Sequence, residues 1–154
     1  MVYNLSLKYL RNEEDAKDCT QEVFVKIYNK LSDFKGQSQL KTWIYRIAVN
    51  KAMDKIRSNK IRNSLTWIGL AKTDLEIFDF NTPGLALEQK EAIDNIMAAI
   101  DDLPKKQKSV IILKRLENLS TAEISEIMKL SEKSVESLIY RAKKTLKESL
   151  NLGK

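Results

Sequence analysis

The sequence contains no histidine and only one cysteine, Cys19, among its 154 residues. An internal disulfide is therefore excluded, as are zinc sites built from cysteine and histidine and every catalytic triad that uses a histidine base. Much hydrolytic chemistry is excluded with them. Glycine and proline are also scarce, with four and two residues. Because sheet proteins usually need more turn residues, this scarcity favours a chain made mostly of helices.

Long apolar runs are also missing. No run approaches the roughly 20 residues that span a bilayer, and the N-terminus lacks a charged segment followed by an apolar core. We therefore expect no membrane insertion and a cytoplasmic location. The net charge of +6 and the isoelectric point near 9.3 favour polyanionic partners such as nucleic acid. A basic surface that serves only solubility is the alternative interpretation of this charge.

A first long helix is predicted from Glu13 to about Leu31. Asn12 is a favourable N-cap, and the three acids that follow it lie near the positive end of the helix dipole. Apolar residues at spacings of three and four predict one buried stripe, which comprises Ala16, Cys19, Val23, Ile27 and Leu31. Cys19 is thus expected in the core and not as a reactive thiol.

A second helix is predicted after a break at residues 34–37. Ser38 can cap this helix, which should extend to about Arg57. Its predicted apolar face comprises Leu40, Trp43, Ile44, Ile47, Ala48 and Ile56. Together with the apolar segment 1–10, these helices can bury a common core, so residues 1–63 are predicted to form a first small domain.

Residues 64–87 are predicted to form a linker. Helical periodicity fades in this stretch, acids accumulate, and residues 81–84 carry a strong turn signal. The stretch is too apolar for a freely solvated tether, so we expect parts of it to pack against something. The residues responsible are Trp67, Ile68, Leu70, Phe78 and Phe80.

Residues 88–154 are predicted to form a second small helical domain. Apolar residues mark a helix around Ile93 to Ile100, and Pro104 suits the first position of the next helix, which should continue through Leu113. The expected fold is therefore all-α, with two small helical domains joined by a linker.

The second domain ends in the most specific local pattern of the chain. Ser120 and Glu123 form a capping box, which predicts a short helix from Thr121 to near Lys129. Ser131 can then cap another helix over residues 132–148. Two helices with so short a connection form a helix-turn-helix.

In a helix-turn-helix the second helix lies in the major groove, and its early residues reach base edges. The outward positions of this helix are mostly basic or hydrogen-bonding. The predicted duplex-binding residues are Lys133, Ser134, Glu136, Ser137, Tyr140, Arg141 and Lys144. A solvated amphipathic helix without a DNA contact is the plainer alternative.

Basic residues also accumulate over residues 41–62, where seven lysines and arginines accompany a single acid, Asp54. Such a stripe attracts phosphate. Aromatic and amide side chains lie among the charges, a mixture that suits unpaired bases because these stack on aromatic rings. The predicted single-strand contacts are Lys41, Trp43, Tyr45, Arg46, Asn50 and Arg57. For Trp43, which falls on the predicted apolar face, a core position is the alternative.

The acidic first helix requires a different partner. DNA would repel its five acids, whereas a basic protein surface would suit them. These acids are Glu13, Glu14, Asp15, Asp18 and Glu22. Ordinary surface acids without a partner are the alternative interpretation.

Taken together, the two halves resemble the extracytoplasmic-function (ECF) sigma factors of bacteria. The family's polymerase-docking helix is similar to the pattern Asp15, Ala16, Asp18, Gln21, Glu22, Val23 and Phe24. Its promoter-melting segment is similar to the pattern Phe34, Gly36, Thr42, Trp43, Ile47, Ala48, Asn50, Asp54 and Arg57. Its module for the −35 promoter element resembles the pattern Leu103, Pro104, Glu123, Ile124, Val135, Ser137, Arg141 and Ala142.

The resemblance implies a non-enzymatic subunit that docks on core RNA polymerase and directs it to promoter DNA, with no cofactor and no metal. It implies that the −10 element is held as a melted strand and the −35 element is read as duplex. The docking residues would be Asp15, Asp18, Gln21 and Glu22, in contact with the clamp helices of the largest polymerase subunit. The linker would thread toward the active-site cleft, and an anti-sigma protein is a further partner that the resemblance admits.

The chain departs from the family pattern in three places. Most of the family's opening helix has no counterpart before Met1, so we expect a truncated or alternatively started form. Lys129 stands where the turn often has glycine. Glu136 and Leu138 replace residues that are commonly basic in the family, which weakens phosphate contact.

Two other classes of function compete with this interpretation. A stand-alone helix-turn-helix regulator would bind duplex DNA without polymerase and would dimerise on paired half-sites. A DNA recombinase would place a serine nucleophile ahead of the DNA-binding module. The recombinase needs an activating cluster that the first half of the sequence does not offer.

Overall fold

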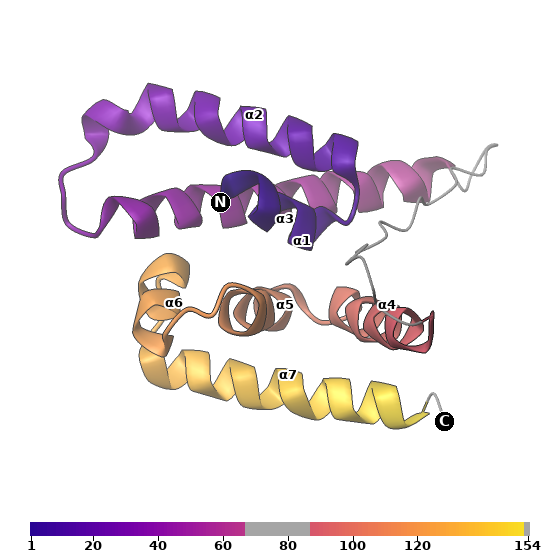
Figure 1. Cartoon of the computed structure of the whole chain (residues 1–154). Coiled ribbons are helices and arrows are strands. Elements are labelled where there is room, and N and C mark those ends of the chain that lie inside the picture. Colours follow the sequence, from indigo (N-terminus) through magenta and orange to yellow (C-terminus); the bar gives the residue numbers. More distant parts are fainter. Residues whose placement is uncertain (67–86, 153–154) are drawn as a thin grey trace. The chain divides into compact units, whose positions relative to one another are not determined.

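The computed structural model describes residues 1–66 and 87–152, and every element in these ranges is helical (Figure 1). The chain divides into two compact units, Met1–Phe78 and Asp79–Lys154. The predicted all-α fold is confirmed. The predicted domain limits at residues 63 and 88 stay a prediction, and the apolar linker residues Trp67, Ile68, Leu70, Phe78 and Phe80 lie outside the described residues.

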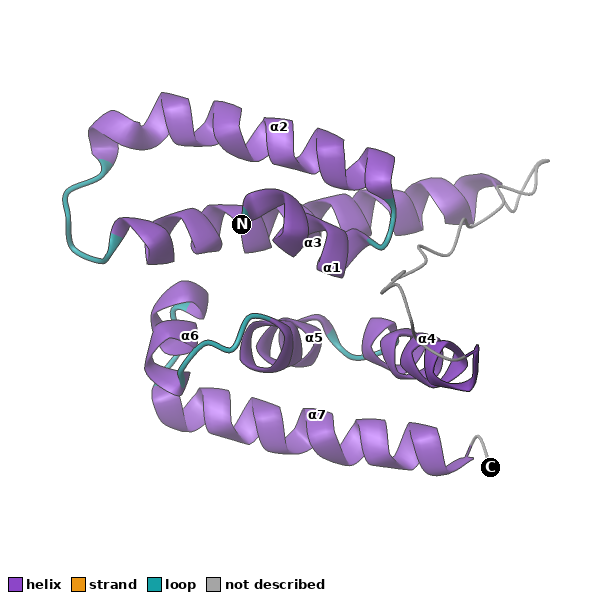
Figure 2. Cartoon of the chain, viewed as in Figure 1, coloured by secondary structure: helices purple, strands orange, loops and turns teal. Residues whose placement is uncertain are grey.

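Over residues 1–66 the first unit contains three α-helices that all contact one another, namely α1 (Val2–Leu10), α2 (Glu13–Lys30) and α3 (Leu40–Thr66). Helices α2 and α3 lie side by side and run in opposite directions (Figure 1). A 3-10 turn, η1 (Leu31–Asp33), and the loop in Figure 2 join them. In this loop Gly36 has a φ of +67°, which glycine adopts without a steric penalty because it lacks Cβ.

Helix α2 begins as predicted. The backbone N–H of Asp15 donates a 2.9 Å hydrogen bond to Oδ1 of Asn12, which confirms the cap. The first three members of the predicted stripe, Ala16, Cys19 and Val23, are buried. Leu31 was wrongly included: it is 52% exposed, because α2 ends at Lys30 and the tighter 3-10 turn changes the residue spacing.

Helix α3 differs from its prediction in length and in the face that it buries. It continues to Thr66 instead of ending near Arg57, because no glycine or proline interrupts it and lysine and arginine are good helix formers. Leu40, predicted to be buried, is 47% exposed. Over residues 40–61 of α3, the buried side chains are Thr42, Tyr45, Ile47, Ala48, Val49 and Ala52. The prediction missed Thr42, Tyr45, Val49 and Ala52 because it centred the inner face near Trp43 and Ile44, whereas the face that is buried lies further around the helix.

The second unit contains α4 (Leu87–Asp101), α5 (Lys105–Ile111), η2 (Ile112–Leu116), α6 (Thr121–Met128) and α7 (Glu132–Leu152). Helix α7 packs against α4, α5 and α6, and it runs along the whole unit in Figure 1. Among residues 91–150, whose burial is described, six side chains are completely shielded from solvent, namely Val110, Ile112, Leu113, Ile124, Val135 and Ala142. These residues form a hydrophobic core that belongs to the second unit alone.

Three details of the second unit differ from the prediction. Pro104 is the N-cap of α5 and not its first helical residue. The predicted continuation through Leu113 changes to π spacing in η2, where the N–H of Glu117 donates to the carbonyl of Ile112 at 3.1 Å. Helix α7 ends at Leu152, beyond the predicted limit at residue 148.

Candidate protein and nucleic-acid interfaces

Helices α6 and α7 form the predicted helix-turn-helix. The capping box of α6 is complete: the N–H of Glu123 donates to Oγ of Ser120 at 3.1 Å, and the N–H of Ser120 donates to Oε2 of Glu123 at 2.7 Å. At the start of α7, the N–H of Ser134 donates to Oγ of Ser131 at 3.2 Å. Both helix starts are thus set by local hydrogen bonds that the sequence pattern predicts.

The turn between these helices passes through Lys129 in the left-handed conformation, with φ 53° and ψ 49°. The N–H of Lys129 donates to the carbonyl of Ser125, and the Ser125 hydroxyl donates to the carbonyl of Leu130 at 2.7 Å. These bonds hold the turn although its backbone conformation favours glycine. The lysine that departs from the family pattern therefore leaves the turn intact.

All seven predicted duplex-binding residues are exposed on α7, namely Lys133, Ser134, Glu136, Ser137, Tyr140, Arg141 and Lys144. Val135 and Ala142 are buried on the opposite side of the helix. Tyr140, an aromatic side chain, is 72% exposed. This face carries basic and hydrogen-bonding side chains, the types that contact phosphates and base edges in a major groove, and the contact itself stays a prediction.

Four of the six predicted single-strand contacts share one face of α3, which we call the strand face: Trp43, Arg46, Asn50 and Arg57. Their spacings of three, four and seven bring them to nearly the same direction around the helix axis. Asn50 and Arg57 are exposed, and Trp43 is partly covered by Phe34, with ring centroids 5.2 Å apart. The strand face therefore combines cations, an amide and a partly buried indole.

The other two predicted contacts, Lys41 and Tyr45, lie away from the strand face. Tyr45 is only 4% exposed, and Nζ of Lys41 lies 5.9 Å from the centroid of its ring. A buried ring has no free face on which an unpaired base can stack. Tyr45 belongs to the core in this structure, so its burial argues against the predicted base contact, which stays a prediction. Lys41 itself is exposed.

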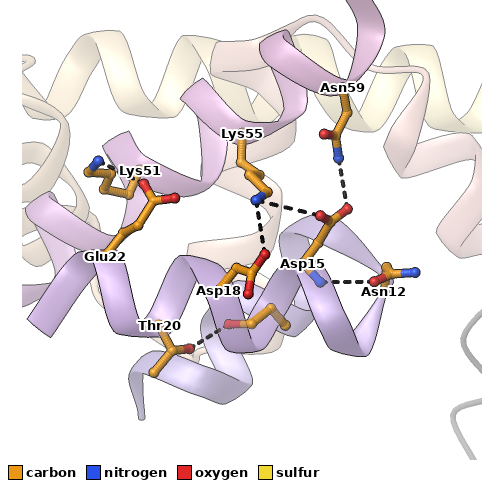
Figure 3. A network of polar contacts seen from close by, with 9 residues as sticks. Asn12, Asp15, Asp18, Thr20, Glu22, Lys51, Lys55 and Asn59 are labelled. Carbon is orange, nitrogen blue, oxygen red and sulfur yellow. Dashed lines mark hydrogen bonds and ion pairs between the residues drawn. The ribbon is translucent and has the colours of Figure 1, made fainter. Parts of the chain in front are cut away.

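The acids of α2 and the lysines of α3 form ion pairs with one another (Figure 3). Nζ of Lys51 lies 2.8 Å from Oε2 of Glu22, and this contact raises the pKa of Lys51. Nζ of Lys55 lies 3.5 Å from Asp18 and 3.6 Å from Asp15. The sequence interpretation assigned the acids and the lysines to different partners, whereas the structure pairs them, so part of the charge on α2 is neutralised within the chain.

The three paired acids differ in how accessible they are. The side chain of Asp15 is 22% exposed and also accepts a 2.8 Å hydrogen bond from Nδ2 of Asn59. The side chains of Asp18 and Glu22 are 63% and 50% exposed, and Gln21 is exposed as well. Asp15 therefore mainly joins α2 to α3, while the other three predicted docking residues face solvent.

Helix α2 also carries an exposed apolar surface that the sequence analysis missed. This apolar ridge comprises Phe24, Val25, Tyr28 and Leu31, which are 56%, 60%, 83% and 52% exposed. Val25 lines a shallow open groove with Asp18, Gln21 and Glu22. Contiguous exposed apolar groups mark interaction surfaces. The sequence did contain a signal for this surface, because Phe24 and Tyr28 are aromatic residues four positions apart that lie outside the predicted buried stripe.

In the part of the chain that the structure describes, no cluster of acids and Cys19 has the arrangement of a metal site. The same ranges contain no helix with the length and apolarity needed to cross a bilayer.

Comparisons with known proteins decide among the function classes. The family models "Sigma-70 region 2" and "Sigma-70, region 4" match residues 1–61 and 93–146. The ECF RNA polymerase sigma factor SigW of Bacillus subtilis is 32% identical over 154 residues, which cover 97% of this chain and 82% of that protein. The chain belongs to the ECF sigma factor family. A second ECF relative, the RNA polymerase sigma-E factor of Haemophilus influenzae, is 33% identical. This match covers 97% of this chain and 81% of that protein.

Solved structures of similar fold include the sigma factor RpoE in complex with the anti-sigma factor NepR from Bartonella quintana. Its TM-score is 0.71 with 21% identity, and the match covers 99% of this chain and 91% of that one. CnrH, solved with the cytosolic domain of CnrY, gives a TM-score of 0.67 with 22% identity, covering 99% and 82%. These matches show a shared fold.

As an ECF sigma factor, the chain acts with core RNA polymerase in promoter recognition and transcription initiation. The function predicted from the sequence is confirmed in preference to a stand-alone helix-turn-helix regulator. The region 2 model matches the first unit, and the region 4 model matches the second. The two units therefore correspond to two regions of sigma factors.

Proposed function

We propose that this sigma factor performs no covalent chemistry and works in the cytoplasm through binding alone. A domain at residues 1–63 docks on polymerase and holds the melted −10 strand, a linker spans residues 64–87, and residues 88–154 read the −35 duplex. The observation that carries this division is the different chemistry of α2 and α3, with an apolar ridge and acids on one helix and exposed cations and an amide on the other.

Helix α2 docks on the polymerase through Asp18, Gln21, Glu22 and the apolar ridge. Stable protein interfaces combine an apolar, often aromatic centre with a polar rim. The ridge supplies the centre, since Tyr28 is 83% exposed and Phe24 is 56% exposed. The acids beside it supply a rim that suits a basic partner. Asp15 contributes indirectly, because it anchors α2 to α3.

The strand face of α3 holds the −10 element after melting. Trp43 offers a partly exposed indole and Asn50 offers hydrogen-bonding groups to unpaired bases, and Arg46 and Arg57 attract phosphates. A surface that binds unstacked bases better than paired ones shifts the equilibrium toward the open strand. Such binding offsets an unstacking cost of about a few kcal/mol per base step.

Helix α7 reads the −35 element through its seven exposed candidate residues. An anti-sigma protein is a further proposed partner, by analogy with RpoE and CnrH, whose structures contain protein partners. Such a protein would act by competing with polymerase for the factor.

Reconstitution with core polymerase on a promoter library tests the proposed function. We expect discrete start sites that share upstream elements near −10 and −35. A gel shift with and without polymerase separates the alternative, because a stand-alone regulator binds duplex DNA tightly by itself. Failure to associate with core polymerase would refute the proposal.

The contribution of the apolar ridge can be tested with Tyr28→Ser. Because buried aromatic anchors dominate interface energies, we expect this change to lower the affinity for core polymerase on the order of tenfold or more. Tyr140→Ser, which alters a tyrosine that is 72% exposed on α7, is the matched control and should leave docking unchanged. Equal losses in both variants would contradict a specific role for the ridge.

A further inference from the structure

Glu136 on α7 has no evident role in the stability of its unit. It is exposed in the second turn of the helix, which begins at Glu132. Glu132, one turn before it, carries the same charge, and Tyr140, one turn after it, carries none, so neither stabilises it across a turn. Lys133 is near in sequence, but no ion pair joins it to Glu136 in the described part of α7.

A carboxylate at this position opposes general binding to DNA. The face around it carries Lys133, Arg141 and Lys144, which attract phosphates, whereas Glu136 is repelled by them. Because repulsion from phosphates weakens binding to every sequence alike, the carboxylate favours binding only where it meets a hydrogen-bond donor on a base edge.

The major groove offers few such donors. Cytosine presents its N4 amino group and adenine its N6 amino group, while guanine presents the acceptors N7 and O6 and thymine presents O4. In adenine, the acceptor N7 lies beside the amino group and repels a second carboxylate oxygen. Cytosine has a C–H at the corresponding place, so it is the base that a carboxylate binds best.

We propose that Glu136 is a specificity-determining residue of this sigma factor and selects cytosine at one position of the −35 element. The inference rests on the proposed contact between α7 and duplex DNA. The location of Glu136 early in α7 suits a base-edge contact, because the first turns of a recognition helix penetrate deepest into the groove. Lys133 and Lys144 supply the phosphate attraction that offsets the repulsion.

The test is a selection from promoters with a randomised −35 region, using the full chain bound to core polymerase. The wild type is compared with Glu136→Gln and with the control Glu148→Gln, which removes the same charge from an exposed position far along α7. The wild type should enrich cytosine at one position. Glu136→Gln should shift that position toward adenine, since an amide pairs with both N6 and N7, and change the cytosine-to-adenine ratio by about tenfold. Glu148→Gln should leave every position unchanged.

Two results would overturn the proposal while leaving the proposed function intact. The first is an unchanged base preference in Glu136→Gln, even if total activity rises through the loss of repulsion. The second is the same shift in both variants, which would assign the effect to net charge. If the wild type yields start sites without any enriched −35 element, the proposed role of α7 fails, and the inference fails with it.

Discussion

Lys129 occupies a backbone conformation in which a side chain is costly, with φ 53° and ψ 49°. Glycine avoids most of this cost, so Lys129→Gly is expected to raise the free energy of unfolding of the second unit by about 0.5–1 kcal/mol. Urea unfolding followed by circular dichroism measures the change. Lys143→Gly, in the interior of α7, is the matched control and should lower stability by about 1 kcal/mol. A loss of stability in Lys129→Gly would contradict the expectation.

Cys19 links the stability of the first unit to pH. The residue is 1% exposed, and burial raises the pKa of its thiol. In the unfolded chain the thiol ionises above about pH 9, whereas in the folded chain it stays protonated to higher pH. The free energy of unfolding should therefore decrease as the pH rises above that value. In the Cys19→Ala variant, the part of this decrease that is due to the thiol should be absent. Urea unfolding at several pH values under reducing conditions measures the free energy of unfolding of both proteins. Identical pH profiles for the two proteins would contradict the linkage.

At the scale of elements, α2 and α3 are joined by ion pairs whose energies should be small. The side chains of Lys51 and Glu22 are 28% and 50% exposed, so solvent screens their attraction. A double-mutant cycle with Glu22→Gln and Lys51→Met should give a coupling of about 0.2–1 kcal/mol that decreases with added salt. A coupling energy well above this range that does not decrease with salt would contradict the prediction, because a solvent-exposed ion pair should contribute little to stability.

The starts of helices could be predicted from the sequence better than their ends and their buried faces. The caps at Asn12 and Ser120 depend on hydrogen bonds within one turn, so the residue pattern alone specifies them. No comparable signal marks the end of α3 at Thr66. Its inner face was misassigned because apolar residues lie on more than one side of α3 and Tyr45 is amphipathic, so only packing against α1 and α2 decides which side chains are buried.

At the scale of the whole molecule, docking and strand retention are assigned to different helices and should be separable. Asn50 is exposed on the strand face of α3 and takes no part in the ion pairs with α2 in Figure 3. Asn50→Ala is expected to reduce promoter opening by up to about tenfold, because a hydrogen bond to an unpaired base contributes about 0.5–1.5 kcal/mol. Its affinity for core polymerase should stay near that of the wild type.

Permanganate reactivity of the melted strand measures opening in this experiment, and a polymerase-binding assay measures docking. Ser58→Ala, at another exposed position of α3, is the control and should change neither quantity. Equal loss of opening and docking in Asn50→Ala would count against the division of roles between α2 and α3.

By itself the sequence determined the helical class, the helix-turn-helix and the family, because caps, periodicity and motifs depend on residues close together in the chain. Only the tertiary structure decided which groups meet: Lys51 and Lys55 with the acids of α2, Tyr45 with the core, and Tyr28 with solvent. These outcomes depend on how each helix is rotated against its neighbours. A shift of one residue turns a side chain by about 100° around the axis, enough to move it from the core to the surface.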